Sequence, residues 1–587
     1  MTERLQTDVL VVGGGGAGFR AAIGAREKGA EVTLVTKGPV ARSGASPMAG
    51  ADLTTHGQGM RAAGFFGEPR DSEETFLNDI LHQGCYLNDQ RLAEIYVRES
   101  PDRLLEMVEW GIKVSFTDER AVFTSGTSIM STLHRQARQM GVNIVGDTAV
   151  LDLLVEDGRV AGALALDLRT GGFLAFDSKA VVLATGGWHR AYTPVTGSRE
   201  LSGDGVAMAL RAGAELANME FVTFCNNVVY WPPMHAGSIF TYVLGLLCGG
   251  VLENSDGERV FAKYDPDMVA HASRTEWNKC FISYISAKEI QAGKGSPHDG
   301  VFYRVGDEPF EEFAERVRHH YPGWKYHSVD FSMVAEKLAS GEGVEVGPAA
   351  EYFEGGVAVN ERYEATVPGL FAAGECASSP FGANRVAAAT MEMLVTGAKA
   401  GWSAAEYAED AVSAAVDVAA AVEAATEPLR RDSGVAPAEV RRRLQAATQK
   451  NLGPIRTEND LKAYLSLLDD MKAAEITQLA TRAQTRRYNM EWIEALDLRN
   501  MVQVLEASAR AALARTESRG VHYRADNPTT DNEGWLKELI VRLNGGEFTI
   551  GTRPVNVTLA SPPQGRRPYL AYIQQMMQGH SDIGGHH

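Results

Sequence analysis

A glycine-rich turn at residues 13–18 constrains the fold of this chain more than any other sequence feature. It has the spacing G-x-G-x-x-G, follows the apolar run DVLVV and precedes the helical sequence AGFRAAIGAREKG. A second apolar run, AEVTLVTK, comes next, so residues 8–37 predict a βαβ unit. In such a unit Gly13 permits the tight turn, Gly15 lets backbone amides approach a pyrophosphate, and Gly18 lets helix and strand pack closely. The helix N-terminus, with about half a positive charge, favours a diphosphate.

The turn therefore predicts a dinucleotide site, against the alternative of an ordinary glycine-rich turn. The acidic residue that usually holds an NAD ribose is missing at the end of the second strand. Thr36 and Lys37 stand there instead. This weakens a nicotinamide interpretation without excluding it.

Length and charge limit the class of protein. A chain of 587 residues exceeds one ordinary core, so we expect two to four domains. The net charge of −18, with no local basic cluster, argues against a nucleic-acid partner. No run approaches the ~20 apolar residues of a membrane span, and no signal peptide is recognisable. We expect a cytoplasmic enzyme without an integral membrane segment.

The cysteines are scattered and form no C-x-x-C pair. They are Cys85, Cys225, Cys248, Cys280 and Cys376. This pattern predicts neither a metal site nor an iron–sulfur cluster within the chain, and it fits a reducing compartment.

The order of predicted elements indicates that the nucleotide domain is discontinuous. The sequence ALALDLRTGGFLAF reads as a hairpin with Gly171-Gly172 at its tip, and AVVLATGG as a buried strand. After an aromatic, irregular stretch, the strand pattern returns at 367–374. Residues 403–425 and 436–515 read as helical. We expect a nucleotide-binding domain at 1–225 and 345–402, an inserted α+β domain at 226–344, a helical domain at 403–515 and a small C-terminal region at 516–587.

Six ordered motifs resemble the flavoprotein subunits of fumarate reductase and succinate dehydrogenase, with L-aspartate oxidase as a relative. The similarity spans nearly the whole chain. The motifs are TLVTKGPVARSGA (33–45), LSGDGVAMALRAGAEL (201–216), NSDGERVF (254–261), VPGLFAAGECA (367–377), GANR (382–385) and ALARTESRGVHYRADNP (512–528).

The resemblance implies an α/β fold in which FAD lies across a Rossmann-like domain under a capping domain, with a helical domain behind. Glu375 would accept from the ribityl hydroxyls, because a carboxylate can accept from two of them. The other implied cofactor contacts are Gly13, Gly15, Gly16, Ala17, Gly18, Lys37, Ser43, Gly44, Ala49, Gly50, Ala149, Asp204, Arg385, Thr390 and Met391.

Many family members link FAD covalently to a histidine in an R-S-H-T-like stretch. This sequence has Arg42-Ser43-Gly44-Ala45 there. Glycine has no side chain to form the bond, so we expect non-covalent FAD.

Two arginines match the family's catalytic positions. Arg274 matches the arginine that donates or accepts the proton, and Arg385 the one that holds a substrate carboxylate. A guanidinium binds a carboxylate bidentately and so fixes its angle as well as its charge. The resemblance implies hydride transfer between flavin and a substrate carbon.

The remaining dicarboxylate ligands of the family are replaced. Cys225 stands for the histidine of F-H-P, Tyr242-Val243 for a Thr-Glu pair, Glu351 for the histidine before Y-x-x-G-G, and Phe381 for the histidine before G-A-N-R. Tyr242 could relay a proton through its hydroxyl.

The change to Glu351 is the most informative. Like charges 4 Å apart repel by about 4 kcal/mol at an effective dielectric of 20, or about three decades in affinity. We therefore expect an acid that is larger or less charged than succinate or fumarate. Alternatively, Glu351 pairs with Arg274 or Arg385, or accepts from a cationic substrate group.

Two other functions remain open. The chain could be an electron-transfer subunit whose partner carries iron–sulfur clusters, or an oxidase related to L-aspartate oxidase that releases peroxide. A nicotinamide-dependent dehydrogenase fits least. The sequence does not give the oligomeric state.

Overall fold

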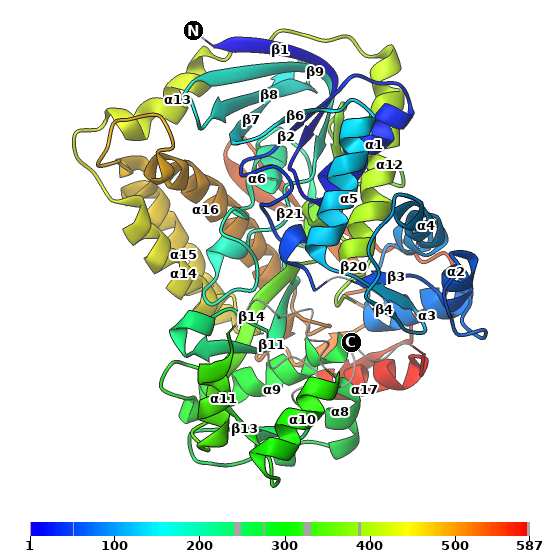
Figure 1. Cartoon of the computed structure of the whole chain (residues 1–587). Helices are drawn as coiled ribbons and strands as arrows, with labels where there is room; N and C mark the ends of the chain where they lie inside the picture. The colour runs from blue at the N-terminus through cyan, green and yellow to red at the C-terminus, as the bar shows by residue number, and fades with distance from the viewer. Residues whose placement is uncertain are drawn as a thin grey trace.

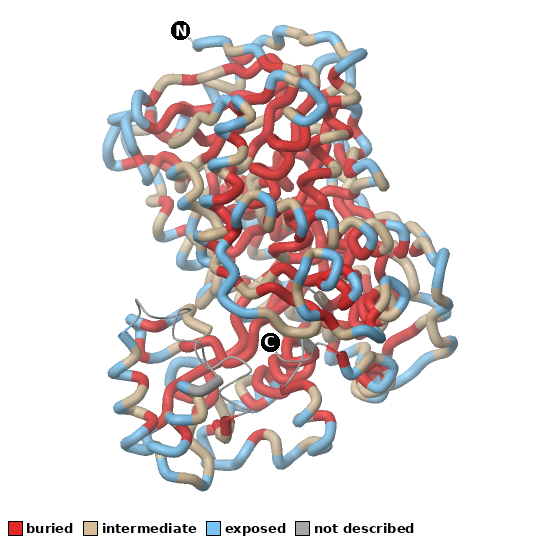
Figure 2. Tube along the Cα trace, turned by 45° about the vertical axis from the view of Figure 1, so that its right-hand side comes forward, coloured by how far each residue is buried: buried red, intermediate tan, exposed pale blue. Residues whose placement is uncertain are grey.

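The fold was analysed in a computed structural model that describes residues 2–50, 52–239, 248–273, 276–320, 330–385 and 389–583. Figure 1 shows an upper body built around one large sheet, with a separate group of strands and helices below it. Figure 2 shows that the most continuous buried region runs through the upper body.

The upper body is centred on a seven-stranded sheet with the order β6-β2-β1-β9-β8-β7, to which β16 adds beside β9. Its strands are β1 (Glu3–Val12), β2 (Val32–Val35), β6 (Asn143–Val145), β7 (Thr148–Glu156), β8 (Arg159–Asp167), β9 (Phe173–Leu183) and β16 (Leu370–Ala372). β1 lies parallel to both β2 and β9. Val9 to Val12 are buried, which explains why the strand reads as an unbroken apolar run.

The predicted βαβ unit and hairpin are both present. Helix α1 (Gly16–Glu27) connects β1 to β2, and β8 pairs antiparallel with β9 across the turn at Gly171-Gly172. The run AVVLATGG does not form a separate strand, because β9 continues through it to Leu183.

β16 lies parallel to β9 although nearly 190 residues separate them. The strand pattern near residue 370 therefore returns to the first sheet, as the sequence suggested. Helix α12 (Ala389–Asp410) then packs along α1 (Figure 1).

Along the chain, helices separate strands of the upper body. The structure has α2 (Gly57–Ala62), α3 (Glu73–Gln83), α4 (Gln90–Glu109), α5 (Gly126–Gln139) and α6 (Asp204–Arg211). Short strands β3 (Asp52–Thr54), β4 (Phe116–Thr117) and β5 (Ala121–Phe123) form a separate small sheet.

The lower group contains a second sheet in the order β11-β14-β13-β12 (Figure 1). Its strands are β11 (Val222–Trp231), β12 (Gly250–Glu253), β13 (Val301–Val305) and β14 (Val344–Phe353). Helices α8 (Pro266–Ala272), α9 (Phe281–Glu289), α10 (Phe310–His320) and α11 (Ser332–Ala339) accompany them. β11 and β14 pair antiparallel, so the two ends of this inserted segment lie together.

The helical part is less continuous than the sequence suggested. Helix α12 ends at Asp410 and α13 (Ala419–Arg430) starts after a non-helical segment. The rest divides into α14 (Pro437–Asn451), α15 (Glu458–Ala474) and α16 (Met490–Ala514). The predicted buried face of α16 is confirmed, since Leu498, Val502, Leu505, Ala509 and Ala512 are all buried.

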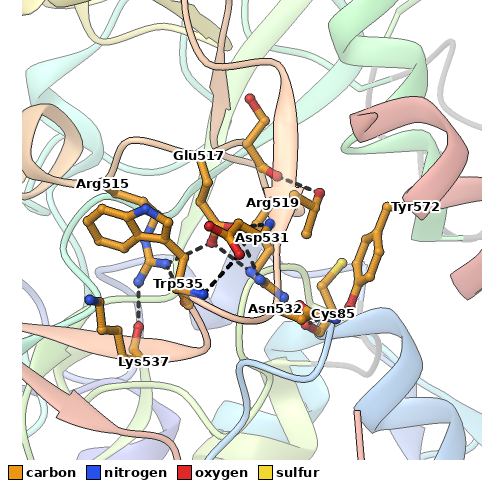
Figure 3. A network of polar contacts seen from close by, with 12 residues as sticks. Cys85, Arg515, Glu517, Arg519, Asp531, Asn532, Trp535, Lys537 and Tyr572 are labelled. Atoms are coloured by element: carbon orange, nitrogen blue, oxygen red, sulfur yellow. Dashed lines mark hydrogen bonds and ion pairs between the residues drawn. The ribbon is translucent and has the colours of Figure 1, made fainter. Parts of the chain in front are cut away.

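The C-terminal region is joined to the body by strands and by buried charges. β20 (Lys537–Asn544) pairs with β10 (Leu216–Ala217) and with β21 (Glu547–Pro554), and α17 (Tyr569–Gly579) contacts α3. Figure 3 shows the charged network beside these strands. The Arg519 guanidinium donates to Glu517 at 2.8 Å and to the carbonyl of Cys85 at 2.8 Å. The network therefore ties the chain's last quarter to a loop near its start.

Among the described residues, no helix combines the length and the apolar character needed to cross a bilayer.

Candidate functional site

The glycine turn joins β1 to α1 and leaves no room for side chains at two positions. A Cβ on Gly13, whose φ is +117°, would lie 2.2 Å from the Ala184 carbonyl oxygen, and a Cβ on Gly18 1.8 Å from the Gly13 oxygen. The first turn of α1 has no acidic residue. The Gly16 amide donates to Ser46 Oγ at 3.1 Å. The local geometry suits an anionic diphosphate at the helix N-terminus.

Lys37 lies just beyond β2 and joins distant parts of the chain. Its Nζ is 2.9 Å from Asp204 Oδ2 on α6 and 2.6 Å from Asp497 Oδ1 on α16. Burial lowers the pKa of Lys37, but the two carboxylates more than offset this and raise it. Burial raises the pKa of Asp497 to about 6. Asp204 also accepts from Asn500 at 2.9 Å.

Glu375 is held by backbone amides. Its carboxylate accepts from the Gly187 amide at 3.0 Å and from the Phe353 amide at 3.3 Å, and His189 Nε2 lies 3.6 Å away. Burial raises the pKa of Glu375. These contacts fix a carboxylate at the junction of the large sheet and β14, where it could accept from hydroxyl groups of a cofactor.

A pocket of about 470 Å³ brings Lys37, Ala149 of β7 and Asp204 together with residues of α16. Three residues that the sequence assigned to the cofactor thus line one space. No residue of the glycine turn lines this pocket, so it adjoins Lys37 and Asp204 on the side of α16.

The other predicted cofactor residues lie on nearby segments. Ser43 Oγ is 3.4 Å from Thr36 Oγ1, and Gly44 has φ +81° with open space where a Cβ would be. Ala49 accepts from the Gly126 amide through its carbonyl, and Gly50 follows it. Thr390 donates its hydroxyl to the Asp52 carbonyl, and Met391 is fully buried in α12.

The predicted substrate side contains a carboxylate beside two cations. Glu351, on β14, lies 3.1 Å from Lys279 Nζ and 3.9 Å from the Arg385 guanidinium, all measured to Oε2. Burial raises the pKa of Glu351, but Lys279 and Arg385 more than offset this and lower it. Glu351 is thus held ionised. The pairing with Arg385 was one of the alternatives left open by the sequence, whereas the pairing with Lys279 was not foreseen.

Lys279 reduces the repulsion that the sequence predicted for a second substrate carboxylate. The figure of about 4 kcal/mol applies to an isolated Glu351 carboxylate, so it is too large for a paired one. Lys279 is only 3% exposed, and its charge offsets that of Glu351. The ionic groups of this triad sum to one positive charge.

Two predicted catalytic residues, Arg274 and Tyr242, lie outside the described residues. Cys225 and Phe381, the other replacements, are both fully buried. Phe381 packs edge-on against Tyr96, with ring centroids 5.1 Å apart. The Phe381 ring therefore packs in the core.

Sequence reasoning missed Lys279, Asp497 and Ser46. Lys279 had a weak signal, because it follows Arg274 by only five residues. Asp497 had none, since it lies 460 residues from Lys37. Ser46 lies between Gly44 and Ala49, two residues that the sequence assigned to the cofactor.

Comparison with known families agrees with this geometry. The family described as FAD binding domain matches residues 8–391, and the family described as fumarate reductase flavoprotein C-term matches residues 441–569. The protein is an FAD-dependent oxidoreductase. More narrowly, the chain belongs to the family of succinate dehydrogenase and fumarate reductase flavoprotein subunits.

Individual relatives match over nearly the full length. The chain is 31% identical to a fumarate reductase (CoM/CoB) subunit of Methanothermobacter marburgensis, over 92% of this chain and 98% of that one. It is 30% identical to the fumarate reductase flavoprotein subunit of Mycobacterium tuberculosis, over 96% and 99%. The solved structure of Mycobacterium smegmatis Sdh1 in complex with UQ1 has 32% identity and a TM-score of 0.83, covering 95% and 96%.

Proposed function

We propose that this protein transfers a hydride between non-covalently bound FAD and a carbon–carbon bond of an organic acid other than succinate or fumarate. The observation that carries the proposal is the ion pair between Glu351 and Lys279 beside Arg385. The family relatives support hydride transfer as the class of reaction, and the ion pair supports a substrate other than succinate or fumarate.

Charge balance supports an acid with one carboxylate at this position. Arg385 carries one positive charge, while the charge of Lys279 is already offset by Glu351. A second substrate carboxylate would have to compete with Glu351 for Lys279. Because a buried charge without a partner is costly, a dianion should bind less well than a monoanion.

Each residue then has a proposed part. Arg385 would bind the carboxylate and fix its angle, and Arg274 would move the proton. Tyr242 would relay a proton through its hydroxyl. Glu351 would hold Lys279 in place and exclude a second carboxylate.

The glycine turn, Lys37, Asp204 and Glu375 would hold the cofactor. FAD supplies the two-electron chemistry when bound. The chain's contribution is to place the phosphate at the α1 N-terminus, to hold the ribityl chain by Glu375, and to set the substrate angle through Arg385. The remaining predicted contacts stay proposals of the same kind.

The test is anaerobic reoxidation of the reduced holoenzyme. Bound flavin is reduced with dithionite, excess reductant is removed, and recovery of flavin absorbance is followed with fumarate and with unsaturated or cyclic monocarboxylic acids. Rapid recovery with a monocarboxylate and slow recovery with fumarate is the expected result. Rapid recovery with fumarate would contradict the proposed substrate class. Peroxide release in air would indicate an oxidase instead.

A second candidate is an electron-transfer subunit that works with an iron–sulfur partner. It is favoured by the names of the relatives, which describe subunits. On this proposal the chain works in the cytoplasm, either free or peripheral to a membrane complex. Purification from the native cell, followed by iron and acid-labile sulfide analysis of any stoichiometric partner, tests it. A chain that elutes alone and fully active would count against it.

A further inference from the structure

Two buried glutamates lie behind Arg385 and take no part in the proposed substrate contacts. They are Glu354, directly after β14, and Glu392 on α12, each only 1% exposed. The Tyr352 hydroxyl donates to Glu392, and the Arg385 guanidinium lies 4.5 Å over the Tyr352 ring. Glu392 is thus linked through one tyrosine to the arginine of the substrate site, and Glu354 follows that tyrosine by two residues in the chain.

Within the part of the chain that the structure describes, neither Glu354 nor Glu392 forms an ion pair. Glu354 accepts from Thr223 Oγ1 at 2.9 Å, and Glu392 accepts from Tyr352. Glu351, by contrast, has Lys279 within 3.1 Å. Because no cation lies at ion-pair distance from them among the described residues, Glu354 and Glu392 can carry protons at little cost.

The surroundings favour the protonated forms. Burial raises the pKa of Glu354 to about 7, against the opposing effect of Arg385. Burial also raises the pKa of Glu392 to about 8, with Glu354 and Glu375 adding to the rise while Tyr352 and Arg385 oppose it. Both groups would titrate close to neutral pH.

Other titratable groups lie near this pair on the neighbouring elements. Among the described residues, none of them places a cation at ion-pair distance from either glutamate. These groups are Tyr352 on β14, Glu375 after β16, Tyr96 on α4, Tyr363 before β16, Lys279 before α9 and Arg385 itself.

We propose that Glu354 and Glu392 form a buried proton store behind Arg385, which takes up a proton when negative charge enters the site in front of it. The inference rests on the proposed function, because Arg385 is taken to face the substrate. Both glutamates are positioning residues, since they act through Arg385 and Tyr352.

The physical basis is the charge of Arg385. Its guanidinium stabilises the ionised forms of both glutamates, so an anion that pairs with Arg385 removes part of that stabilisation. A proton from solvent then forms an O–H bond on one of the two carboxylates. No electrons move in this step, and the proton is released when the negative charge leaves. The store keeps the charge of the buried site nearly constant.

The first experiment counts protons in the FAD-loaded enzyme. The flavin is reduced at an electrode through a mediator in weakly buffered solution between pH 7 and pH 8, with an indicator dye reporting proton uptake. We expect the wild type to take up more protons per flavin than the double variant Glu354→Gln, Glu392→Gln, by a fraction of a proton up to about one. Equal uptake would overturn the proposal.

A matched control is Glu506→Gln on α16. Glu506 is also buried, but its carboxylate is paired with Lys472 at 2.6 Å and with Arg510 at 2.7 Å. This variant should take up as many protons as the wild type. If it lowered uptake as much as the double variant does, general loss of a buried carboxyl would explain the effect and the proposal would fail.

Infrared difference spectra give a second measurement that needs neither substrate nor reduction. A protonated-carboxyl band should titrate between pH 6 and pH 9 in the wild type and shrink in each single glutamine variant. This remains measurable in a variant that binds FAD poorly. A band unchanged in both variants would overturn the store, while leaving the reoxidation test of the proposed function unaffected.

Discussion

At the scale of single residues, Glu351 shows how a neighbour decides what a side chain can do. Taken alone, its carboxylate would repel any second carboxylate of the substrate. With Lys279 Nζ 3.1 Å away, the carboxylate forms an ion pair, so the lysine charge is no longer available to a substrate carboxylate. The two interpretations predict the same substrate preference but different consequences of mutation.

Replacing Glu351 by glutamine should free Lys279 to bind a second carboxylate. We expect the variant Glu351→Gln to bind a dicarboxylate such as malonate about tenfold to a hundredfold more tightly, the value of one charged hydrogen bond. Perturbation of flavin absorbance measures the dissociation constant. Lys279→Met should weaken binding of the same probe. Unchanged affinity in Glu351→Gln would place the pair away from the substrate.

The raised pKa values of Glu354 and Glu392 also make stability depend on pH. In the unfolded chain both would titrate near pH 4.5, and in the folded chain near pH 7 and pH 8. Their protonated forms stabilise the fold at low pH, and this contribution is lost as pH rises from about 5 to above 8.

We therefore expect the double glutamine variant to gain stability relative to the wild type as pH rises. The Tm difference between the two proteins, measured from pH 5 to pH 8.5, should move in favour of the variant. A difference that stays constant across this range would show that the two carboxyls ionise normally in the fold.

At the scale of elements, the βαβ unit depends on close backbone contact at its turn. A Cβ on Gly18 would lie 1.8 Å from the Gly13 oxygen, so Gly18→Ala must push α1 away from β1. We expect loss of bound FAD and a destabilisation of about 1–3 kcal/mol from overpacking. Flavin content and Tm measure both effects. Gly172→Ala, at a partly exposed hairpin tip, is the matched control and should retain full flavin.

The loop after β2 predicts how the cofactor is attached. Gly44 has no side chain, and space is open at its Cβ position. Precipitation with acid should therefore release all of the yellow chromophore into the supernatant. Flavin that stays with the precipitated protein would reveal a covalent link to some other residue.

At the scale of the whole molecule, α16 reaches the cofactor region through Asp497 and Asn500. Asp497 shares Lys37 with Asp204, and Asn500 donates to Asp204. The helical part therefore contacts two of the proposed cofactor residues, Lys37 and Asp204, from a point 460 residues beyond Lys37 in the chain.

Substituting Asp497 by asparagine should weaken this connection. One carboxylate around Lys37 is lost, so we expect a cost of about 1–3 kcal/mol and a lower FAD affinity. Titration of apoprotein with FAD, together with urea unfolding, measures the two effects. Asp470→Asn, on the exposed surface of α15, serves as control. Equal FAD affinity in both variants would show that α16 has no influence on the cofactor.

Local sequence patterns were sufficient to predict the βαβ unit, the hairpin, the return of the chain to the first sheet and the buried face of α16. Glycine spacing, period-two and helical patterns, and turn residues act within a few neighbours, so they can be read without the fold. The family and the FAD cofactor came from ordered motifs, which also need no geometry. The helix boundaries after residue 403 were less accurate, because alanine-rich sequence favours helix even where the fold interrupts it.

The electrostatics of the site, in contrast, became visible only in the folded chain. The fold places Lys279 against Glu351, Asp497 against Lys37, and Tyr352 between Glu392 and Arg385. A charge's effect falls with distance and grows with burial, and both are set by which distant segments the fold brings together. The residues proposed to bind FAD could thus be named from motifs, whereas the charge left for the substrate depended on partners that no spacing in the sequence reveals.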